Sequence, residues 1–286
     1  MDFSVFEVPA LRWVFLLGVT AALLGMEWAA PFRTPMQSKL KHVSTNLIIF
    51  GSNSLIAQFI AGLTLLIWSS YVTSEGWGLL YQLSLGPVAH VMVSIILLDL
   101  VAYGLHRLYH HLPLLWRLHR AHHSDLDMDA TTSIRFHLGE VVVTTGIKGL
   151  TVWALGVSPA GFLISESVTL AAGLFSHGNV RLPSRFEPRL RWAIVTPTMH
   201  WIHHSRRPAD HNTNFGAVFS GWDRLFGSYC MRVAQHEIQF GLDEYRTPED
   251  VTLMRFYRMP FDKACRGMEQ DTSPTTSTVV GTNVKP

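Results

Sequence analysis

The chain has 286 residues, of which 48% are hydrophobic and 15% are charged, whereas soluble domains carry about 25% charged residues. A net charge of +2 without a long basic block argues against nucleic-acid binding. The two cysteines, Cys230 and Cys265, leave no room for a disulfide framework or a thiolate metal site. The composition therefore favours a membrane protein that uses neither disulfides nor nucleic acid.

Apolar stretches predict the fold class. A helix that crosses a bilayer needs about 20 mostly apolar residues. Three stretches meet this length, at residues 15–32, 43–68 and 85–105. A fourth, 141–175, is too long for one span and contains the breaker Gly-Val-Ser-Pro-Ala-Gly at 156–161. We therefore expect an all-α protein with about four to five membrane spans, the last two forming a short antiparallel pair.

Charge bias predicts the orientation of these spans. Arginine and lysine residues follow the first and third spans, whereas the 71–81 connection contains Glu75 and neither Lys nor Arg. The positive-inside rule places the basic segments in the cytoplasm, and the final pair of spans returns the chain there. We expect one membrane-embedded domain over residues 1–267 with a cytosolic helical cap. The Thr/Ser-rich tail, 268–286, is expected to be disordered.

Fifteen histidines are present, and most fall in short bursts between residues 106 and 211. On a helix, residues three and four apart share a face. Each burst can thus present two or three imidazoles to one small volume, and eight imidazoles are more than one ion can use. The number of imidazoles therefore indicates two metals. Imidazole suits iron, zinc, copper and nickel, so the ligand type does not choose the element. The bursts are His106-x-x-x-His110-His111, His119-x-x-His122-His123 and His200-x-x-His203-His204.

This order of histidine boxes, with membrane spans between the second and the third, resembles the fatty acid hydroxylase/sterol desaturase superfamily. The likeness covers roughly residues 99–229. Two positions depart from the usual pattern: Leu138, where many relatives have proline, and Trp201, where arginine is common and where the change can alter the substrate pocket. Further matching segments include Leu115-Trp116-Arg117-x-His119, His123-Ser124-Asp125, Thr132-x-x-Arg135-x-His137, Asn214-Phe215-Gly216 and Trp222-Asp223-Arg224-Leu225-Phe226-Gly227.

The resemblance implies a helical membrane anchor under a cytosolic cap, with a histidine-coordinated di-iron centre near the membrane face. His177 is included as a ninth ligand because relatives supply an extra histidine just before the last box. The ligands carried over by motif are His106, His110, His119, His122, His123, His177, His200, His203 and His204.

A second group of polar residues is expected to support the ligands from outside. Asp99, on one helical stripe with Tyr103 and His106, would orient a ligand on another helix or pair with an acid-binding partner in the helix packing. The other expected supporting residues are His137, Glu140, His211 and Asn214. Three further histidines, His42, His90 and His236, are interpreted as incidental.

The resemblance further implies a reaction with dioxygen that hydroxylates or desaturates a membrane lipid, such as a sterol or a fatty acyl chain. The cofactor would be two iron ions, although zinc can replace them in purified protein. Haem motifs, ferredoxin cysteines and a Gly-rich dinucleotide fingerprint are missing from the sequence, so electrons would come from a separate donor protein. Arg206 and Arg207 are candidates for docking that donor or for contacting lipid headgroups.

Two other classes of protein remain as alternatives. A divalent-metal transporter would hold its histidines near the bilayer midplane on discontinuous spans. A zinc-dependent membrane hydrolase would need one metal with an open coordination position and a general-base carboxylate, for which Glu140 is the only nearby candidate.

Overall fold

The computed structural model describes residues 7–53 and 59–262. Within these ranges the long regular elements are all helices. Three isolated β-bridges are also present. The predicted disordered tail, 268–286, lies outside them. The helices are α1 (Glu7–Ala29), α2 (Lys39–Asn53), α3 (Phe59–Ser74), α4 (Leu79–Gln82), α5 (Pro87–His111), α6 (Pro113–His123), α7 (Leu138–Leu155), α8 (Pro159–His177), α9 (Glu187–Ala193), α10 (Pro197–His203), α11 (Pro208–His211), α12 (Gly221–Leu225) and α13 (Leu253–Arg258).

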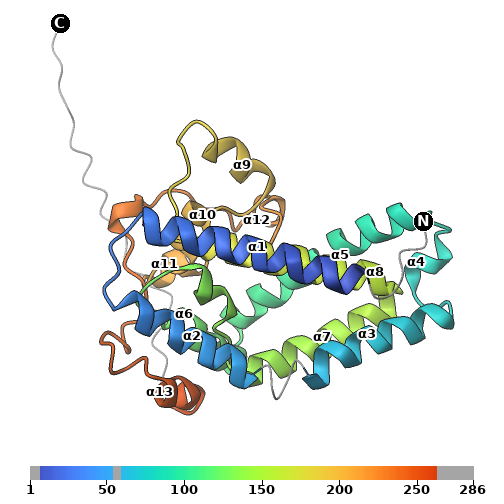
Figure 1. Cartoon of the computed structure of the whole chain (residues 1–286), viewed down its shortest axis with the longest axis horizontal. Helices are drawn as coiled ribbons and strands as arrows, with labels where there is room; N and C mark the ends of the chain where they lie inside the picture. Colours follow the sequence, from blue (N-terminus) through green and yellow to red (C-terminus); the bar gives the residue numbers. More distant parts are fainter. Residues whose placement is uncertain (1–6, 54–58, 263–286) are drawn as a thin grey trace, which may run out of the picture.

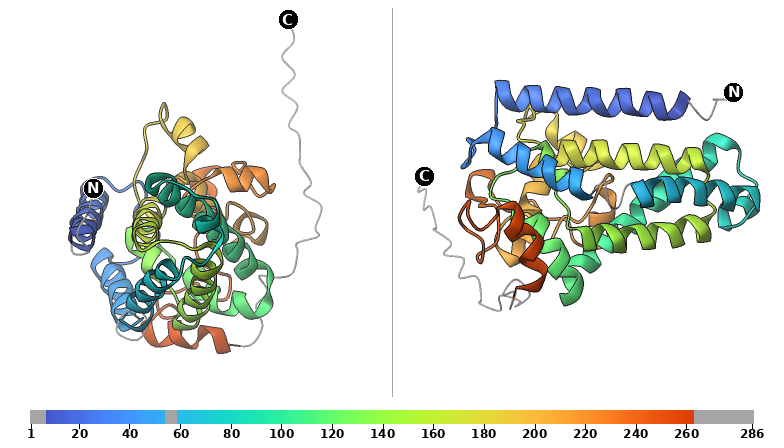
Figure 2. Two further views of the ribbon diagram at one scale, coloured as in Figure 1. Left: turned by 90° about the vertical axis from the view of Figure 1, so that its right-hand side faces the viewer. Right: turned by 60° about the horizontal axis from the view of Figure 1, so that its bottom comes forward.

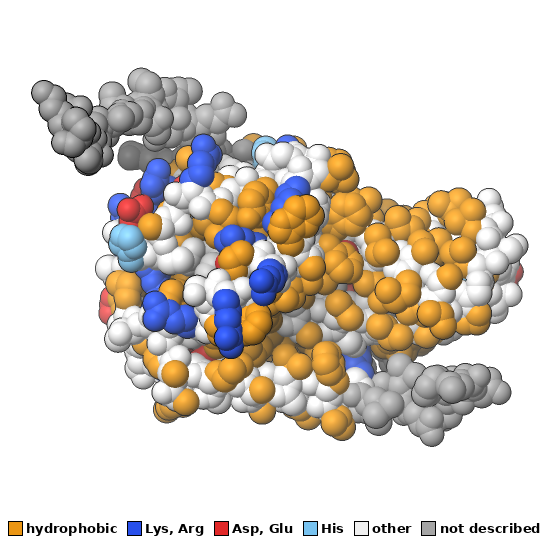
Figure 3. Space-filling model, turned by 90° about the horizontal axis from the view of Figure 1, so that it is seen from above, with side chains coloured by type: hydrophobic (Ala, Val, Ile, Leu, Met, Phe, Trp, Pro, Cys, Tyr) orange, Lys and Arg blue, Asp and Glu red, His pale blue; other side chains and the backbone are white. Residues whose placement is uncertain are grey.

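Four of these helices, α1, α5, α7 and α8, are long and apolar enough to cross a membrane. They run side by side along the long axis, while the short helices α6 and α9 to α13 gather toward one end and α4 lies at the other (Figure 1; Figure 2, right). Between 17% and 33% of each apolar window is buried, so most of these side chains face outward, as lipid-facing helices require. Figure 3 shows hydrophobic side chains covering one end and basic side chains gathered at the other. The prediction of an all-helical, multi-span protein is confirmed.

The hairpin of α7 and α8 is confirmed at the predicted breaker. Gly156 ends α7 in the left-handed conformation (φ 74°), which glycine adopts without a steric penalty. Ser158 then caps α8 by accepting a hydrogen bond from the Gly161 N–H, and Pro159 occupies its first turn. The two helices therefore run antiparallel, and α8 returns the chain to the end where α5 finishes.

The predicted second span, 43–68, differs from the structure. Its first part belongs to α2, its second part to α3, and residues 54–58 lie outside the described ranges. Neither helix alone has the 18 residues that a candidate span needs. The physical reason lies in α2, where His42, Asn46 and Asn53 are buried in polar contacts with the segment after the second histidine box. That face of α2 cannot be turned toward lipid.

His42 makes the strongest of these contacts. Its Nε2 lies 2.8 Å from Asp125 Oδ1, and its Nδ1 lies 2.9 Å from Asp129 Oδ2. Burial alone would lower the pKa of His42, but the two carboxylates outweigh it and hold that pKa well above the ordinary value. Burial likewise opposes charge on Asp125, yet His42 and Arg135 lower its pKa to about 2. The interpretation of His42 as incidental is wrong, because it neutralises two buried carboxylates.

Replacing His42 with alanine should lower the stability of the fold by about 3–5 kcal/mol, because two buried carboxylates lose their cation. His236, whose side chain is 83% exposed, provides the control: His236→Ala should leave the melting temperature unchanged. Thermal unfolding of the detergent-solubilised protein at neutral pH measures both.

The same pair of variants gives a pH dependence. A lowered pKa means that Asp125 stabilises the fold above its ordinary pKa of 3.8, and that this contribution is lost as the pH falls toward about 2. The raised pKa of His42 keeps its contribution until the pH climbs through that raised value. The penalty of His42→Ala should therefore be greatest between about pH 4 and pH 6.5, shrink below about pH 4, and decline as the pH rises from 6.5 toward the raised pKa of His42. A penalty that grows as the pH falls below about 4 would contradict the ion-pair assignment.

Candidate metal centre

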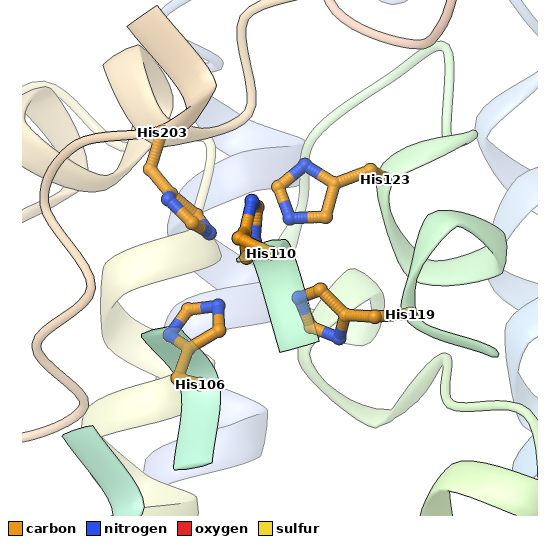
Figure 4. Close-up of side chains that lie close together, drawn as sticks. All are labelled: His106, His110, His119, His123 and His203. Carbon is orange, nitrogen blue, oxygen red and sulfur yellow. The ribbon is translucent and has the colours of Figure 1, made fainter. Parts of the chain in front are cut away.

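Eight histidines of the three boxes converge with His177 in two groups. The first comprises His106, His110, His119, His123 and His203, and the second comprises His122, His177, His200 and His204. Within each group, one nitrogen from every ring lies within 4.8 Å of the corresponding nitrogens of the others. Figure 4 shows the rings of the first group pointing toward one another from α5, α6 and α10. All nine are buried except His106, which is half-buried.

Helical spacing explains how each His-x-x-His-His box serves both groups. On α6, His119 and His123 are four residues apart and share the face that meets the first group, while His122 turns toward the second. On α10 the arrangement is reversed, because His200 and His204 join the second group and His203 joins the first. The two boxes thus form a bridge between two neighbouring sites.

Hydrogen bonds fix the proton positions in the first group. The Nδ1 atoms of His106 and His203 lie 2.8 Å from the carbonyl oxygens of Phe215 and Thr213, and His119 Nδ1 lies 2.7 Å from Glu140 Oε1. Each of these oxygens can only accept, so the proton sits on Nδ1 and Nε2 keeps a lone pair. The Nε2 atoms of all three are buried and have no partner in the described structure.

Two rings of the second group likewise carry the proton on Nδ1 and a lone pair on Nε2. His177 Nδ1 donates to the Gly173 carbonyl at 2.8 Å, and His122 Nδ1 donates to the Arg135 carbonyl at 3.2 Å. The two Nε2 atoms, which then both carry lone pairs, face each other at 3.2 Å. His200 Nε2 lies a further 3.1 Å from His177 Nε2 and 3.2 Å from His204 Nε2. Two lone pairs cannot form a hydrogen bond, so this arrangement requires a cation between the rings.

Burial keeps five of the imidazoles neutral, which is the form that binds metal. Desolvation, reinforced by neighbouring imidazoles, holds the pKa of His122, His123, His200, His203 and His204 well below the ordinary value. A neutral imidazole is the form that donates to a metal. The donor set therefore fits two metal ions bound by imidazole nitrogen, and the identity of the metal does not follow from the geometry.

Glu140 is the expected supporting residue whose side chain hydrogen-bonds a ring of the two groups. Its carboxylate, on the first turn of α7, is buried and accepts from His119 Nδ1. A carboxylate in this position fixes the tautomer of the imidazole and raises its basicity toward a metal.

Asp99 acts through the backbone instead of on a ring. Its carboxylate accepts from the N–H groups of Val218 and Phe219, both at 3.0 Å, and from the indole of Trp222 at 2.8 Å. It therefore holds the loop whose Phe215 carbonyl orients His106. Asp99 hydrogen-bonds no histidine on another helix, and these contacts agree instead with the alternative expectation of an acid paired with a partner in the helix packing.

Sequence reasoning missed Asp223, which secures this loop from its other side. The buried carboxylate accepts from the N–H groups of Phe215 and Gly216 at 2.7 and 2.9 Å, and from the Ser228 hydroxyl at 2.7 Å. Asp223 stood within the matching segment 222–227, which was the available signal. Its carboxylate faces backbone groups that only the tertiary fold brings to it.

The other expected supporting residues lie farther from the nitrogens. Tyr103 contacts the Ser228 hydroxyl at 2.7 Å, and Asn214 bonds the backbone of Met199 and Cys230. His137 caps α7 by accepting from the Gly139 N–H. His211 stacks on Trp116 with ring centroids 5.2 Å apart, beside His110 and His123. These residues brace the elements that carry the rings.

Arg206 and Arg207, the candidate donor-docking residues, each have a carboxylate nearby. The guanidinium of Arg206 lies 3.7 Å from Asp243, and that of Arg207 lies 3.5 Å from Asp210. Both arginines remain largely exposed, so their charges are partly compensated at the surface and give little support for a dedicated docking site.

Comparisons with known proteins agree with the histidine geometry. The model of the family described as "Fatty acid hydroxylase" matches residues 91–228. The ornithine lipid hydroxylase OlsE of Rhizobium tropici is 30% identical over 164 residues, which are 57% of this chain and 46% of that protein. Alkylglycerol monooxygenase of Xenopus tropicalis is 27% identical over 146 residues (50% and 31%). Cholesterol 25-hydroxylase of Rattus norvegicus is 27% identical over 153 residues (52% and 49%).

These matches cover less than half of the length of each of the three relatives. No solved structure matches the chain. The matched region nevertheless contains all nine histidines of the two groups and the loops that hold them. Residues 91–228 of the chain are thus similar to the fatty acid hydroxylase family.

Proposed function

We propose that this protein is a membrane-bound di-iron oxidoreductase that uses dioxygen to hydroxylate, or by a second hydrogen loss to desaturate, a lipid. The observation that carries the proposal is the convergence of nine imidazoles, eight of them buried and His106 half-buried, in two adjacent groups. The relatives' names supply the reaction class, because all three act on lipids as hydroxylases or monooxygenases.

The donor set supports redox chemistry more than hydrolysis. The nine proposed ligands are neutral, and Glu140 is the only carboxylate that hydrogen-bonds one of them within the described residues. Di-iron sites in four-helix bundles instead use several carboxylates as ligands. Two reduced iron ions held between these rings would activate dioxygen so that it can oxidise an unactivated C–H bond.

The chain's own residues would position the metals and keep the pocket dry. Backbone carbonyls at Phe215, Arg135, Gly173 and Thr213 and the Glu140 carboxylate hold five Nδ1 protons, so the rings cannot turn. Burial excludes bulk water, which protects a strong oxidant from side reactions. The site lies at the ends of α5 and α8, where a substrate dissolved in the bilayer can reach it.

The remaining parts of the proposal rest on sequence arguments. We place the histidine-bearing end in the cytoplasm because the basic residues gather there (Figure 3). Electrons would come from a separate donor protein. The transporter alternative is weakened because the histidines lie at helix ends, away from the middle of the spans. The hydrolase alternative is weakened because Glu140, its candidate base, is engaged by His119.

Neighbouring histidines at the end of α5 allow a matched test. His110→Ala removes a ring from the first group, whereas His111, which is exposed and bonds only the Arg107 carbonyl in the described structure, is its control. We expect His110→Ala to lower lipid oxidation by more than about 100-fold, since even residues one step removed from a metal contribute about 10–100-fold. His111→Ala should keep most of the activity.

The readout is the lipid extract of expressing cells grown under ¹⁸O₂, analysed by mass spectrometry against cells without the gene. A hydroxylated lipid carrying ¹⁸O, or a desaturated lipid whose formation stops without oxygen, supports the proposal. Lipid cleavage with oxygen taken from water would contradict it and favour the hydrolase.

Glu140→Gln tests the carboxylate that orients His119. The amide keeps the size of the side chain but loses the charge that strengthens the imidazole, so metal affinity should fall by about 10–100-fold. Metal retained per chain after dialysis against a graded chelator series measures this change. Glu249→Gln, an exposed substitution of the same kind, should retain metal as the wild type does. Equal retention in both variants would show that Glu140 has no part in metal binding.

A further inference from the structure

A cavity of about 600 Å³ lies outside the two histidine groups, where α1 and α8 leave the candidate membrane region. Its walls come from the segment after α1 (32–36), the segment after the second box (126–129), the residues after α8, Trp201 on α10, and the loop 235–240. None of the nine converging histidines lines it. The cavity therefore sits at the depth of lipid headgroups without belonging to the metal centre.

Three aromatic rings line the cavity and contact two arginines. Phe32 stacks on Trp201 with ring centroids 5.3 Å apart, and Phe240 meets Trp201 edge-on at 5.3 Å. The Arg33 guanidinium lies 4.9 Å from the centroid of Phe240 and 5.6 Å from that of Trp201. The Arg181 guanidinium lies 5.0 Å from the centroid of Phe32. Such cation–π contacts orient a guanidinium and leave its N–H groups available at the edge.

The two arginines of this cavity are not paired with Asp127 or Asp129, the carboxylates that also line it. Among the described residues, neither Arg33 nor Arg181 has a carboxylate within 4.0 Å. Asp127 accepts from the N–H groups of Met36 and Gln37, and Asp129 is paired with His42. An anion entering the cavity would thus meet two guanidinium groups whose charge is unsatisfied.

Two polar atoms of the lining also lack partners. Trp201 is fully buried, and its indole N–H has no acceptor in the described structure. Gln235 donates its Nε2 to the Thr198 carbonyl, but its buried Oε1 accepts from nothing in the same part of the chain. Buried polar groups are normally paired, so these two unpartnered atoms, on residues that line the cavity, are free to accept or donate to a ligand that reaches them.

We propose that this cavity binds the headgroup of an anionic phospholipid that also carries hydroxyl donors. A phosphate matches the two guanidinium groups, the hydroxyl matches Gln235 Oε1, and the position beside two membrane helices places the headgroup at the cavity while its acyl chains remain in the bilayer. This site is independent of the proposed oxidation chemistry, since it needs neither the metals nor the electron donor.

The test uses the full-length protein in mild detergent with phosphatidylglycerol as the probe and phosphatidylcholine as the comparison. Native mass spectrometry counts the bound lipid over a titration. Wild type should bind phosphatidylglycerol preferentially, and Arg33→Gln and Arg181→Gln should each weaken it roughly fivefold or more, the factor expected for one basic residue near an anionic headgroup. Arg185→Gln removes the same charge from an arginine outside the cavity lining and should leave binding unchanged.

Several outcomes would overturn the proposal. One is equal binding of the two lipids, and another is equal loss in Arg185→Gln. A thermal stabilisation by inorganic phosphate alone that matches that of the lipid would identify a free-anion site instead. Arg33 also donates to the Ile238 carbonyl, so Arg33→Gln can disturb the loop. Arg181→Gln breaks no hydrogen bond in the described structure, and unchanged binding by that variant, at wild-type melting temperature in phosphatidylcholine, rejects the site.

Discussion

The interaction on which the rest of this structure depends is the repulsion between imidazole lone pairs that the fold brings face to face. His122 and His177 point two unprotonated Nε2 atoms at each other at 3.2 Å, and the first group aims the Nε2 atoms of His106, His119 and His203 into a shared space. Burial lowers the pKa of His122 and His203 well below the ordinary value, so these two rings do not relieve the repulsion by taking up protons. Cations between the rings convert this repulsion into bonding, which makes the centre a place where metal binding and folding are coupled.

Buried carboxylates around this neutral centre hold its loops and rings in position. Asp99 and Asp223 grip the loop that presents the Phe215 carbonyl to His106, and Glu140 fixes His119. Asp125 and Asp129 bind α2 through His42 and so anchor the segment that follows the second box. Because these acids accept hydrogen bonds or pair with His42, they add little negative charge to the metals themselves. Under the proposed function, a strongly positive pair of metal ions held at the ends of two spans would suit oxidation of a lipid better than hydrolysis.

Eight of the nine histidines could be predicted from their spacing in the three boxes, whereas His177 came only from the family resemblance and the division of each His-x-x-His-His box between two groups was not predicted. The α7–α8 hairpin could be predicted from Gly156, Ser158 and Pro159. Contacts that depend on chain segments far apart could not. Nothing near His42 indicates that Asp125 and Asp129, more than 80 residues away, would surround it. Asp99 and Asp223 bind backbone N–H groups, which every sequence possesses, so no residue pattern marks their partners. The polar face that α2 buries against protein could not be predicted for a related reason, since hydropathy cannot tell such a face from an occasional polar residue in lipid.

The most direct measurement of the central claim is a metal count joined to X-ray absorption spectroscopy on protein purified without oxygen. The account predicts close to two irons per chain, with first-neighbour scattering from imidazole nitrogen and none from sulfur. One zinc per chain, or two metals bound chiefly by carboxylate oxygen, would contradict it.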